Sequence, residues 1–461
     1  MNQPLNKHPS QPLHPTGMLA FTIIWIGQVI SLLGSAMTTF ALTIWAWEIT
    51  GEATALALVG FFSFAPTILI SPFAGALVDR WNRKFVMMLS DLAAVSSTVA
   101  VLLLFSTGNL QIWHLFATGA FAGAFGAFQF PAYSAAVTTM VSKEQYGRAS
   151  GMLSAAQFAS GIFAPALAAI LLGITGITGI LTFDIITFLV AIGALLLVHV
   201  PQPVITEEGR KSRGSLWKES VYGFHYIFER RGLLGLLIVF FGINLVATFA
   251  FTLIAPMILA RSESDVATLG IVQSAIGIGG MVGSVLLSIW GGPKRRIHGV
   301  LIGLTLVMLG VLFIGFGRNP IVWVPAAFFA MFFIPIVQGS SNAIWQVKVA
   351  PDVQGRVFAT RALIATISRP AALLLTGPLA DNVFEPALMT GGSLVHVFGG
   401  LVGIGPGAGM ALMFLISGSL GMFVGLGGYA FRVVRNVEDI LPDHTQQVVT
   451  PTETHKKPAR G

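Results

Sequence analysis

The chain has 461 residues, of which 54% are hydrophobic and only 10% are charged, and its mean hydropathy is +0.81. This composition excludes a soluble globular fold, whose surface needs many more charged residues. The net charge of +7 comes from short basic segments between long apolar runs, so we do not expect a nucleic-acid partner. The absence of cysteine excludes disulfides, thiol catalysis and cysteine-based metal sites.

Twelve apolar runs are each long enough to cross a bilayer as a helix, which takes about 20 residues. All of them are expected to be helices, because an open strand cannot satisfy its backbone in lipid. The fourth and tenth runs are unusually long and are expected to protrude from the membrane or to kink. The predicted spans are 18–47, 54–78, 85–106, 111–140, 149–173, 177–200, 233–260, 266–291, 297–317, 320–348, 355–379 and 406–432.

Lysine and arginine alternate between the connections of these spans, which predicts the topology. Connections two, four, six, eight and ten are basic, whereas the odd connections contain little besides Arg261 and Arg318. Because basic loops stay in the cytoplasm, the pattern predicts twelve crossings of the cell membrane with both termini inside. Residues 1–17 form the predicted N-terminal cytoplasmic tail, and they lack the pattern of a cleaved signal peptide.

The sixth connection, residues 201–232, divides the chain into two halves. It contains a predicted amphipathic helix over 216–231 that suits the face of a bilayer. Gly147-Arg148 and Gly355-Arg356 occupy equivalent points of the two halves, which indicates an internal repeat, although two such pairs also arise by chance. The predicted domains are an N-terminal six-helix bundle over 18–200, the linker, a C-terminal six-helix bundle over 233–432, and a disordered cytoplasmic tail over 433–461.

A charged motif lies in the loop between the second and third spans. It reads Gly75-x3-Asp79-Arg80-x2-Arg83-Lys84 and resembles the loop signature of the major facilitator superfamily. The resemblance implies an all-α integral membrane fold of twelve transmembrane helices in two pseudo-symmetric six-helix bundles, which expose a central cavity to each side of the membrane in turn. It further implies that Asp91 joins the charge network of this loop and latches the cytoplasmic gate.

Polar side chains recur on single faces of four predicted spans, and the family resemblance implies that these four helices line the central cavity. Polar groups at this depth are costly against lipid, which favours a hydrated cavity. The alternative is that serine and threonine bond their own helix backbone and that asparagine and glutamine tie helices together. The predicted cavity residues are Gln28, Ser31, Ser35, Thr38, Gln129, Tyr133, Asn244, Thr248, Gln338, Asn342, Trp345 and Arg369.

Arg369 is the deepest predicted arginine, roughly 21 Å along the eleventh helix from Gly355 at 1.5 Å per residue. An arginine at this depth needs water, a carboxylate or an anionic group of a substrate. The alternative is a structural arginine satisfied by neighbouring helices. Arg361, which is nearer the cytoplasm, is expected to extend its side chain out of the membrane.

Two carboxylates fall inside predicted spans, and either can carry a proton when buried. Asp184 in the sixth span is the candidate for proton coupling, while Asp91 is assigned to the gate. In the fifth span, Gly161-Ile-Phe-Ala-Pro165 resembles a fragment of the family's antiporter motif, although an ordinary proline kink explains it equally well.

The chain most resembles the drug- and siderophore-exporting branch of the family, which contains macrolide efflux pumps and the enterobactin exporter. The matching segments are Ser31–Gly34, Asp184–Phe188 and Gly377–Phe384. The prediction is a monomeric, proton-coupled exporter of amphipathic organic compounds. It has no cofactor, no metal and no enzymatic constellation. The alternatives are a proton-coupled importer of a small organic anion held by Arg369, and a membrane protein that transports nothing.

Overall fold

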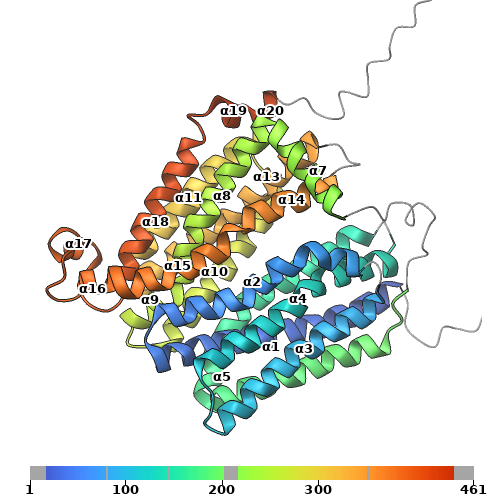
Figure 1. Cartoon of the computed structure of the whole chain (residues 1–461), viewed down its shortest axis with the longest axis horizontal. Helices are drawn as coiled ribbons and strands as arrows, with labels where there is room; N and C mark the ends of the chain where they lie inside the picture. The colour runs from blue at the N-terminus through green and yellow to red at the C-terminus, as the bar shows by residue number, and fades with distance from the viewer. Residues whose placement is uncertain (1–16, 79–80, 143–144, 202–215, 350–353, 441–461) are drawn as a thin grey trace, which may run out of the picture. The chain divides into compact units, whose positions relative to one another are not determined.

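The computed structural model describes residues 17–78, 81–142, 145–201, 216–349 and 354–440 (Figure 1). In this part of the chain every regular element is a helix, and eleven continuous helical stretches are apolar and long enough to cross a membrane. The longest of them is interrupted at Gly176, where φ is 65° and ψ is −171°. It holds two crossings, because its 47 residues would extend about 70 Å. The predicted all-α membrane fold with twelve crossings is confirmed.

The chain forms two compact units, which are described separately. Unit 1 contains Met1–Arg210 and Ile258–Ser274, and unit 2 contains Lys211–Met257 and Ala275–Gly461. The first six crossings therefore lie in unit 1 and the last six in unit 2, except that residues 258–274 cluster with unit 1. The division into domains at 201–232 stays a prediction.

Unit 1 is built from five long helices that pack side by side (Figure 1). The closest partners are α1 with α5, α2 with α4, and α3 with α4. The Asn82 side chain caps α3 by accepting a hydrogen bond from the backbone N–H of Phe85. The helices are α1 (Gly17–Thr50), α2 (Ala53–Val78), α3 (Arg83–Ser106), α4 (Ile112–Met140) and α5 (Tyr146–Leu197).

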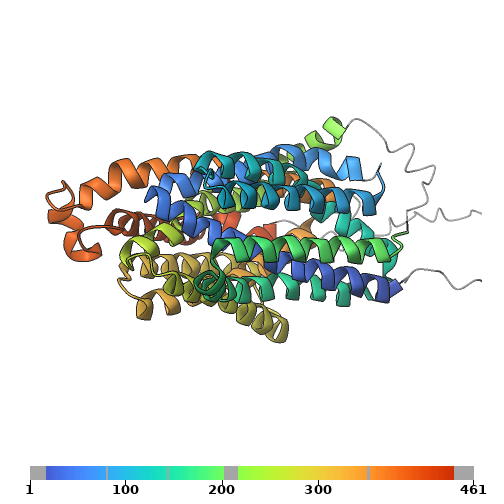
Figure 2. The same cartoon turned by 90° about the horizontal axis from the view of Figure 1, so that it is seen from below.

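Unit 2 is centred on α11, which packs against α18, α12 and α13. A short excursion through α16 and α17 protrudes beyond the end of α15 (Figure 2). Helices α9 and α10 begin or end across the boundary between the units. The elements are α7 (Leu216–Glu229), α8 (Arg231–Thr252), α9 (Ile254–Arg261), α10 (Val266–Trp290), α11 (Arg296–Phe316), α12 (Pro320–Phe332), α13 (Ile334–Lys348), α14 (Gln354–Thr366), α15 (Ser368–Leu379), η2 (Ala380–Phe384), α16 (Glu385–Leu388), α17 (Val395–Val402), α18 (Ala408–Gly427), α19 (Arg432–Arg435) and α20 (Val437–Ile440).

Three of the crossings in this half are broken where the sequence predicted one run. The breaks fall at Leu253, Phe333 and Ile367. Each lies two or three residues before a proline, which cannot donate the backbone hydrogen bond that the preceding turn needs. The kink expected in the tenth span is therefore present. The eleventh crossing also continues past its predicted end at 379, through the π-helical turn η2 to Leu388.

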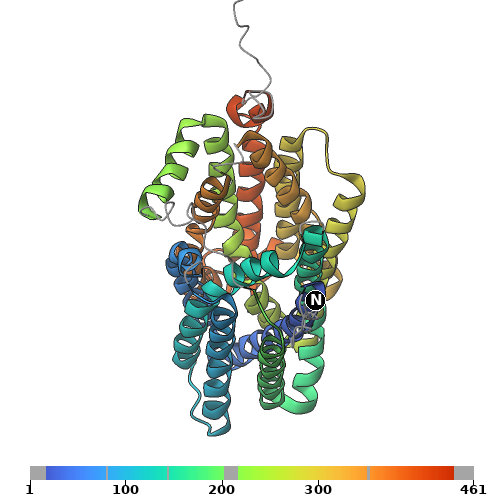
Figure 3. The ribbon, with the colours of Figure 1, turned by 90° about the vertical axis from the view of Figure 1, so that its right-hand side faces the viewer.

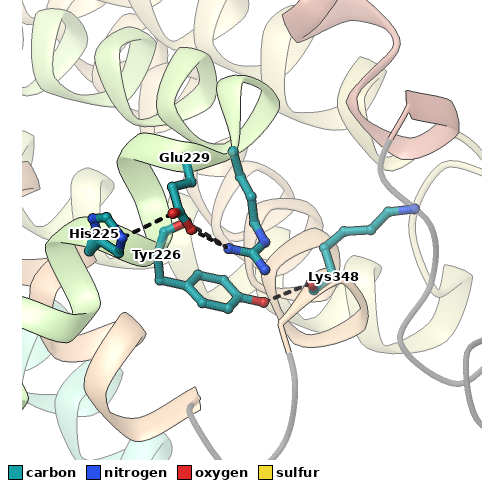
Figure 4. Close-up of polar contacts among 5 residues, drawn as sticks. His225, Tyr226, Glu229 and Lys348 are labelled. Atoms are coloured by element: carbon teal, nitrogen blue, oxygen red, sulfur yellow. Dashed lines mark hydrogen bonds and ion pairs between the residues drawn. The ribbon is translucent and has the colours of Figure 1, made fainter.

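The linker helix predicted over 216–231 corresponds to α7. It meets α8 at a tight corner (Figure 3) and packs mainly against α14. The Tyr226 hydroxyl donates to the carbonyl oxygen of Lys348 over 3.5 Å, while His225 pairs with Glu229 on the exposed side (Figure 4). One face of α7 is thus packed against the protein. The sequence predicted a helix that lies on the bilayer and did not predict this contact.

The segment that follows the last crossing forms α19 and α20 as far as Ile440, where the sequence predicted a disordered tail from 433. Val434 and Val437 are buried, and Glu438 accepts hydrogen bonds from the backbone N–H groups of Arg296 (3.1 Å) and Ile297 (2.9 Å). The Lys348 ammonium donates to the carbonyl oxygen of Glu438. Helix α20 therefore caps the N-terminus of α11, which favours a carboxylate there. The remaining predicted tail, 441–461, lies outside the described residues.

This cap predicts a measurable difference between two adjacent acids. We expect Glu438→Ala to lower the free energy of unfolding by about 1 kcal/mol, because it leaves backbone donors of α11 without their acceptor. Asp439→Ala should change it by close to zero, since Asp439 only forms an exposed ion pair with Arg295 at 3.4 Å. Thermal unfolding of the purified variants measures both. Equal losses of stability for the two substitutions would contradict the assignment of Glu438 as the cap.

Candidate functional site

Asp91 lies in unit 1 on α3, where two glutamine side chains hold its carboxylate. Gln28 of α1 donates to Oδ2 over 3.0 Å, and Gln129 of α4 donates to Oδ1 over 2.9 Å. The Gln129 amide also contacts Oε1 of Gln28 at 3.1 Å. Asp91 is 4% exposed. Three helices therefore meet at a buried carboxylate with neutral partners, and two residues predicted to line the cavity, Gln28 and Gln129, belong to this cluster.

A cavity of about 650 Å³ opens beside this cluster. Its walls come from α1, α4 and α5, and they combine the aromatic side chains of Trp25, Phe130 and Tyr133 with the amides of Gln28 and Gln129. The Tyr133 hydroxyl and Oε1 of Gln129 are buried and lack a hydrogen-bond partner among the described residues. The volume falls within the range of pockets for drug-sized molecules, and polar groups without partners are what a ligand or water would satisfy.

The position of Asp91 differs from the role implied by the family resemblance. Asp79 and Arg80 of the loop motif lie outside the described residues, while Gly75 lies within α2. Arg83 donates to the carbonyl oxygen of Ala135 over 2.6 Å, and Lys84 donates to the carbonyl of Val198 over 2.8 Å. These two cations therefore fasten α3 to the ends of α4 and α5. In the described structure Asp91 bonds the two glutamines, so its place in the charge network of the gate stays a prediction.

Asp184, on the second half of α5, forms a separate buried cluster in the same unit. Thr98 of α3 donates to Oδ2 over 3.0 Å, and Ser35 of α1 donates to Oδ1 over 3.3 Å. The carboxylate is 1% exposed. Gly34 permits this approach, because a Cβ atom there would lie 2.9 Å from Oδ1 of Asp184.

The Asp184 carboxylate lines a cavity of about 260 Å³ that is rich in hydroxyl groups. Thr38, which was predicted to line the central cavity, contributes to it, and its hydroxyl is buried. Buried polar groups of this kind are normally hydrogen-bonded, so the cavity suits ordered water. The hydroxyl-bearing residues that line it are Ser35, Thr38, Thr39, Thr43, Ser63, Ser97, Thr98 and Thr118.

The two carboxylate clusters are arranged in the same register on two helices. Gln28 and Ser35 are seven residues apart on α1, and Asp91 and Thr98 are seven residues apart on α3. Seven residues correspond to two helical turns, or about 10.5 Å. Ser31, buried on the intervening turn of α1, was also predicted to be a cavity residue. The polar face of α1 thus points into its own bundle, where Gln28 bonds Asp91 and Ser35 bonds Asp184.

The polar residues of the seventh and tenth crossings in unit 2 behave differently from one another. Asn244 and Thr248 on α8 donate to backbone carbonyls one turn earlier, at 2.9 and 2.7 Å. This is the local bonding that was the alternative to a cavity role. Gln338 and Asn342 on α13 are exposed four residues apart, and an exposed amide face on a membrane helix has to meet water or protein rather than lipid.

The two arginines of the eleventh crossing differ in their surroundings, and the cavity role predicted for Arg369 stays a prediction. Arg369, predicted as the site arginine, has an exposed side chain on α15. Arg361 does not extend out of the membrane: its Nη1 donates to Oδ1 of Asn342 over 3.0 Å and its Nη2 donates to Oγ of Ser341 over 2.9 Å. Its guanidinium also lies 5.1 Å from the ring centre of Trp345. Sequence spacing missed this cluster because its members come from two different helices.

The segment that resembles the antiporter motif lies inside α5 of unit 1. Pro165 is within the helix, and the first turns of α10 pack closely against it. A Cβ atom on Gly270 would lie 3.2 Å from the carbonyl oxygen of Pro165, and Ser274 donates to the carbonyl of Ile162 over 2.8 Å. Gly161 and Pro165 therefore mark a close helix–helix contact, while a role in antiport stays a prediction.

The chain is similar to known membrane transporters over most of its length. The model of the Major Facilitator Superfamily matches residues 24–373. Macrolide efflux protein A of Streptococcus pyogenes is 26% identical over 374 residues, which are 79% of this chain and 90% of that protein. Multidrug efflux pump Tap of Mycolicibacterium fortuitum is 26% identical over 390 residues, which are 80% of this chain and 91% of that protein.

Solved structures show the same fold at low sequence identity. The inward-facing, unoccupied structure of a bacterial homologue of the human lysosomal transporter Spinster has a TM-score of 0.66 and 13% identity, and the match covers 89% of this chain and 98% of that one. A POT family transporter in complex with 5-aminolevulinic acid has a TM-score of 0.62 and 13% identity, with coverage of 89% and 95%.

Proposed function

Because the chain belongs to the major facilitator superfamily, a family of membrane transporters, we propose that it exports amphipathic organic compounds in exchange for protons. It is a multi-pass membrane protein, and its relatives include proteins named for macrolide and multidrug efflux. The observation that carries the proposed coupling is the Asp184 carboxylate, which is 1% exposed inside a cavity lined by hydroxyl groups.

The substrate class is supported by the cavity beside Asp91. Its aromatic walls offer apolar surface, and its unpartnered phenol and amide groups offer a few hydrogen bonds. Pockets that are mostly apolar with a small number of polar groups bind compounds that are themselves amphipathic. A sugar would require many more polar contacts than Gln28, Gln129 and Tyr133 provide.

Proton coupling follows from the chemistry of the Asp184 cluster. An ionised carboxylate taken out of water is costly unless it is paired, and its partners here, Ser35 and Thr98, are neutral. Uptake of a proton removes the charge, and the same hydroxyls can then accept as well as donate. Asp184 thus binds and releases a proton as access to water changes, and Asp91, two turns along α3 from Thr98, is a second acid on the same path.

Transport proceeds by alternating access. The two six-helix bundles expose the cavity first to the cytoplasm and then to the outside, and the loop motif of Gly75, Asp79, Arg80, Arg83 and Lys84 holds the cytoplasmic gate. Both termini and the basic connections lie in the cytoplasm, and the protein acts as a monomer in the cell membrane. The bilayer, the small-molecule substrate and the proton are the partners that this function requires.

Accumulation in cells tests the proposed direction. We expect expression in a host that lacks its own pumps to lower the steady-state retention of ethidium or erythromycin relative to an empty vector. Addition of a protonophore should restore retention, because it collapses the gradient that drives export. Unchanged retention of several amphipathic compounds would contradict drug export. Increased uptake of a small organic anion would instead favour the second candidate, a proton-coupled importer, which the intramembrane cation Arg361 makes plausible.

A further inference from the structure

Arg361 on α14 is a cation at the start of an apolar crossing, and it is held by groups that carry no charge. It donates hydrogen bonds to the side chains of Asn342 and Ser341 on α13. Among the residues that the structure describes, no carboxylate forms an ion pair with it. Holding a guanidinium beside neutral groups alone is costly in an apolar crossing, which points to a negatively charged ligand as the missing partner.

The guanidinium retains donors for such a charge. Arg carries five N–H groups in a planar fork, and the two bonds to α13 use one on each terminal nitrogen. The remaining donors match the two oxygens of a carboxylate, which arginine binds more tightly than neutral acceptors. The side chain is half-buried rather than enclosed, so a ligand can reach it.

Two aromatic side chains adjoin the guanidinium, and the indole N–H of one of them lacks a partner among the described residues. Its central carbon lies 5.1 Å from the ring centre of Trp345 and 6.0 Å from that of Phe240 on α8. These ring faces stabilise the cation and fix its position. Trp345 is 1% exposed, and its Nε1–H has no acceptor in the described part of the chain. The site therefore combines an immobilised cation with apolar surface and a spare neutral donor.

We propose that Arg361, Asn342 and Trp345 form a subsite in unit 2 for the anionic group of an amphipathic ligand, with a carboxylate as the best fit. This inference rests on the proposed function and narrows it: the preferred substrates carry an acid at one end of an apolar body. Arg361 binds the acid, Asn342 holds the guanidinium in place, and the buried rings of Trp345 and Phe240 support the cation from within the protein.

Matched acid and ester ligands test the subsite by binding alone. The full-length protein is placed in nanodiscs of neutral phosphatidylcholine, and the dissociation constants of cholate, of 2-naphthoate and of their methyl esters are measured by scintillation proximity. We expect each acid to bind at least about tenfold more tightly than its ester, the size of one charge-assisted hydrogen bond. Arg361→Gln should remove this preference by weakening the acids, and Arg361→Lys should retain part of it. Arg318→Gln, at an exposed arginine that donates to the carbonyl oxygen of Gly400, should leave it unchanged.

The outcomes separate the subsite from the transport proposal and from a purely structural role. Equal affinity of the native protein for both acids and their esters, or an unaltered acid preference in Arg361→Gln, overturns the subsite. A structural role for Arg361 would weaken acid and ester alike, together with thermal stability. Binding with the predicted preference but no gradient-driven transport would instead overturn the proposed function. The binding measurement is then repeated in nanodiscs that contain anionic phosphatidylglycerol. If cholate no longer binds there, the lipid headgroup occupies the subsite.

Discussion

Replacing Asp184 by asparagine is expected to abolish transport that is driven by a pH gradient. The substitution keeps the size of the side chain, and its amide can still bond both Ser35 and Thr98 if one of these hydroxyls turns to accept, but it removes the carboxylate that carries the proton. In proteoliposomes with an imposed pH gradient, movement of a fluorescent amphipathic probe should fall to the rate seen in empty vesicles. Equilibrium binding of the probe should persist, because the 650 Å³ cavity is lined by other residues.

Asp265 provides the matched control for this substitution. It lies between α9 and α10, where the Thr268 hydroxyl and the backbone N–H groups of Ala267 and Thr268 hold the pKa of its carboxyl below the usual range. It therefore stays ionised at the pH of the assay and cannot exchange a proton. Asparagine is an equally good helix cap, so Asp265→Asn should transport normally. Normal gradient-driven transport by Asp184→Asn would show that another group carries the proton.

Adding a single methyl group at Gly123 is expected to disrupt the packing of unit 1. A Cβ atom there would lie 2.1 Å from the carbonyl oxygen of Ser63, so α2 and α4 would have to move apart. Overpacking of this kind costs about 1–3 kcal/mol. Gly123 and Ser63 also line the cavity that contains Asp184, so the same substitution should impair coupling. Thermal unfolding of Gly123→Ala, followed by size-exclusion chromatography, measures the loss.

Gly126, one turn further along α4, is the control. A Cβ atom there meets nothing within 4 Å, and alanine favours a helix over glycine by about 1 kcal/mol. Gly126→Ala should therefore unfold at the same temperature as the native protein or slightly above it. If both variants lost stability to the same extent, the close approach of α2 and α4 would not be the cause.

The crossings could be predicted from the sequence because each is determined locally. A run of about 20 apolar residues in lipid has to be helical, and basic loops separate the runs. The breaks at Leu253, Phe333 and Ile367 follow from nearby prolines in the same way. Of these three crossings, only the tenth was expected to protrude or to kink. The ordered α20 was missed because its stability depends on the distant N-terminus of α11, which residues 433–440 do not reveal by their own composition.

The candidate site was predictable only in part, because its side chains meet across helices. Gln28, Ser31, Ser35 and Thr38 were predicted to share one face of a helix, but the partners of Gln28 and Ser35 on α3, α4 and α5 lie 63 or more residues away along the chain. The same limit hid the partners of Arg361, since hydropathy gives the depth of an arginine and not the direction in which its side chain turns. The cluster of Arg361 with Ser341 and Asn342 becomes visible only when α13 and α14 are placed together.

The central claim is that unit 1 couples outward transport to protons. Reconstitution into vesicles tests this coupling most directly. Purified protein is placed in proteoliposomes with an imposed pH gradient, and accumulation of a labelled amphipathic compound is followed with and without a protonophore. The account predicts accumulation on the acidic side that the protonophore abolishes and that Asp184→Asn lacks. Accumulation that is independent of the pH gradient, or that is driven by a sodium gradient instead, would contradict it.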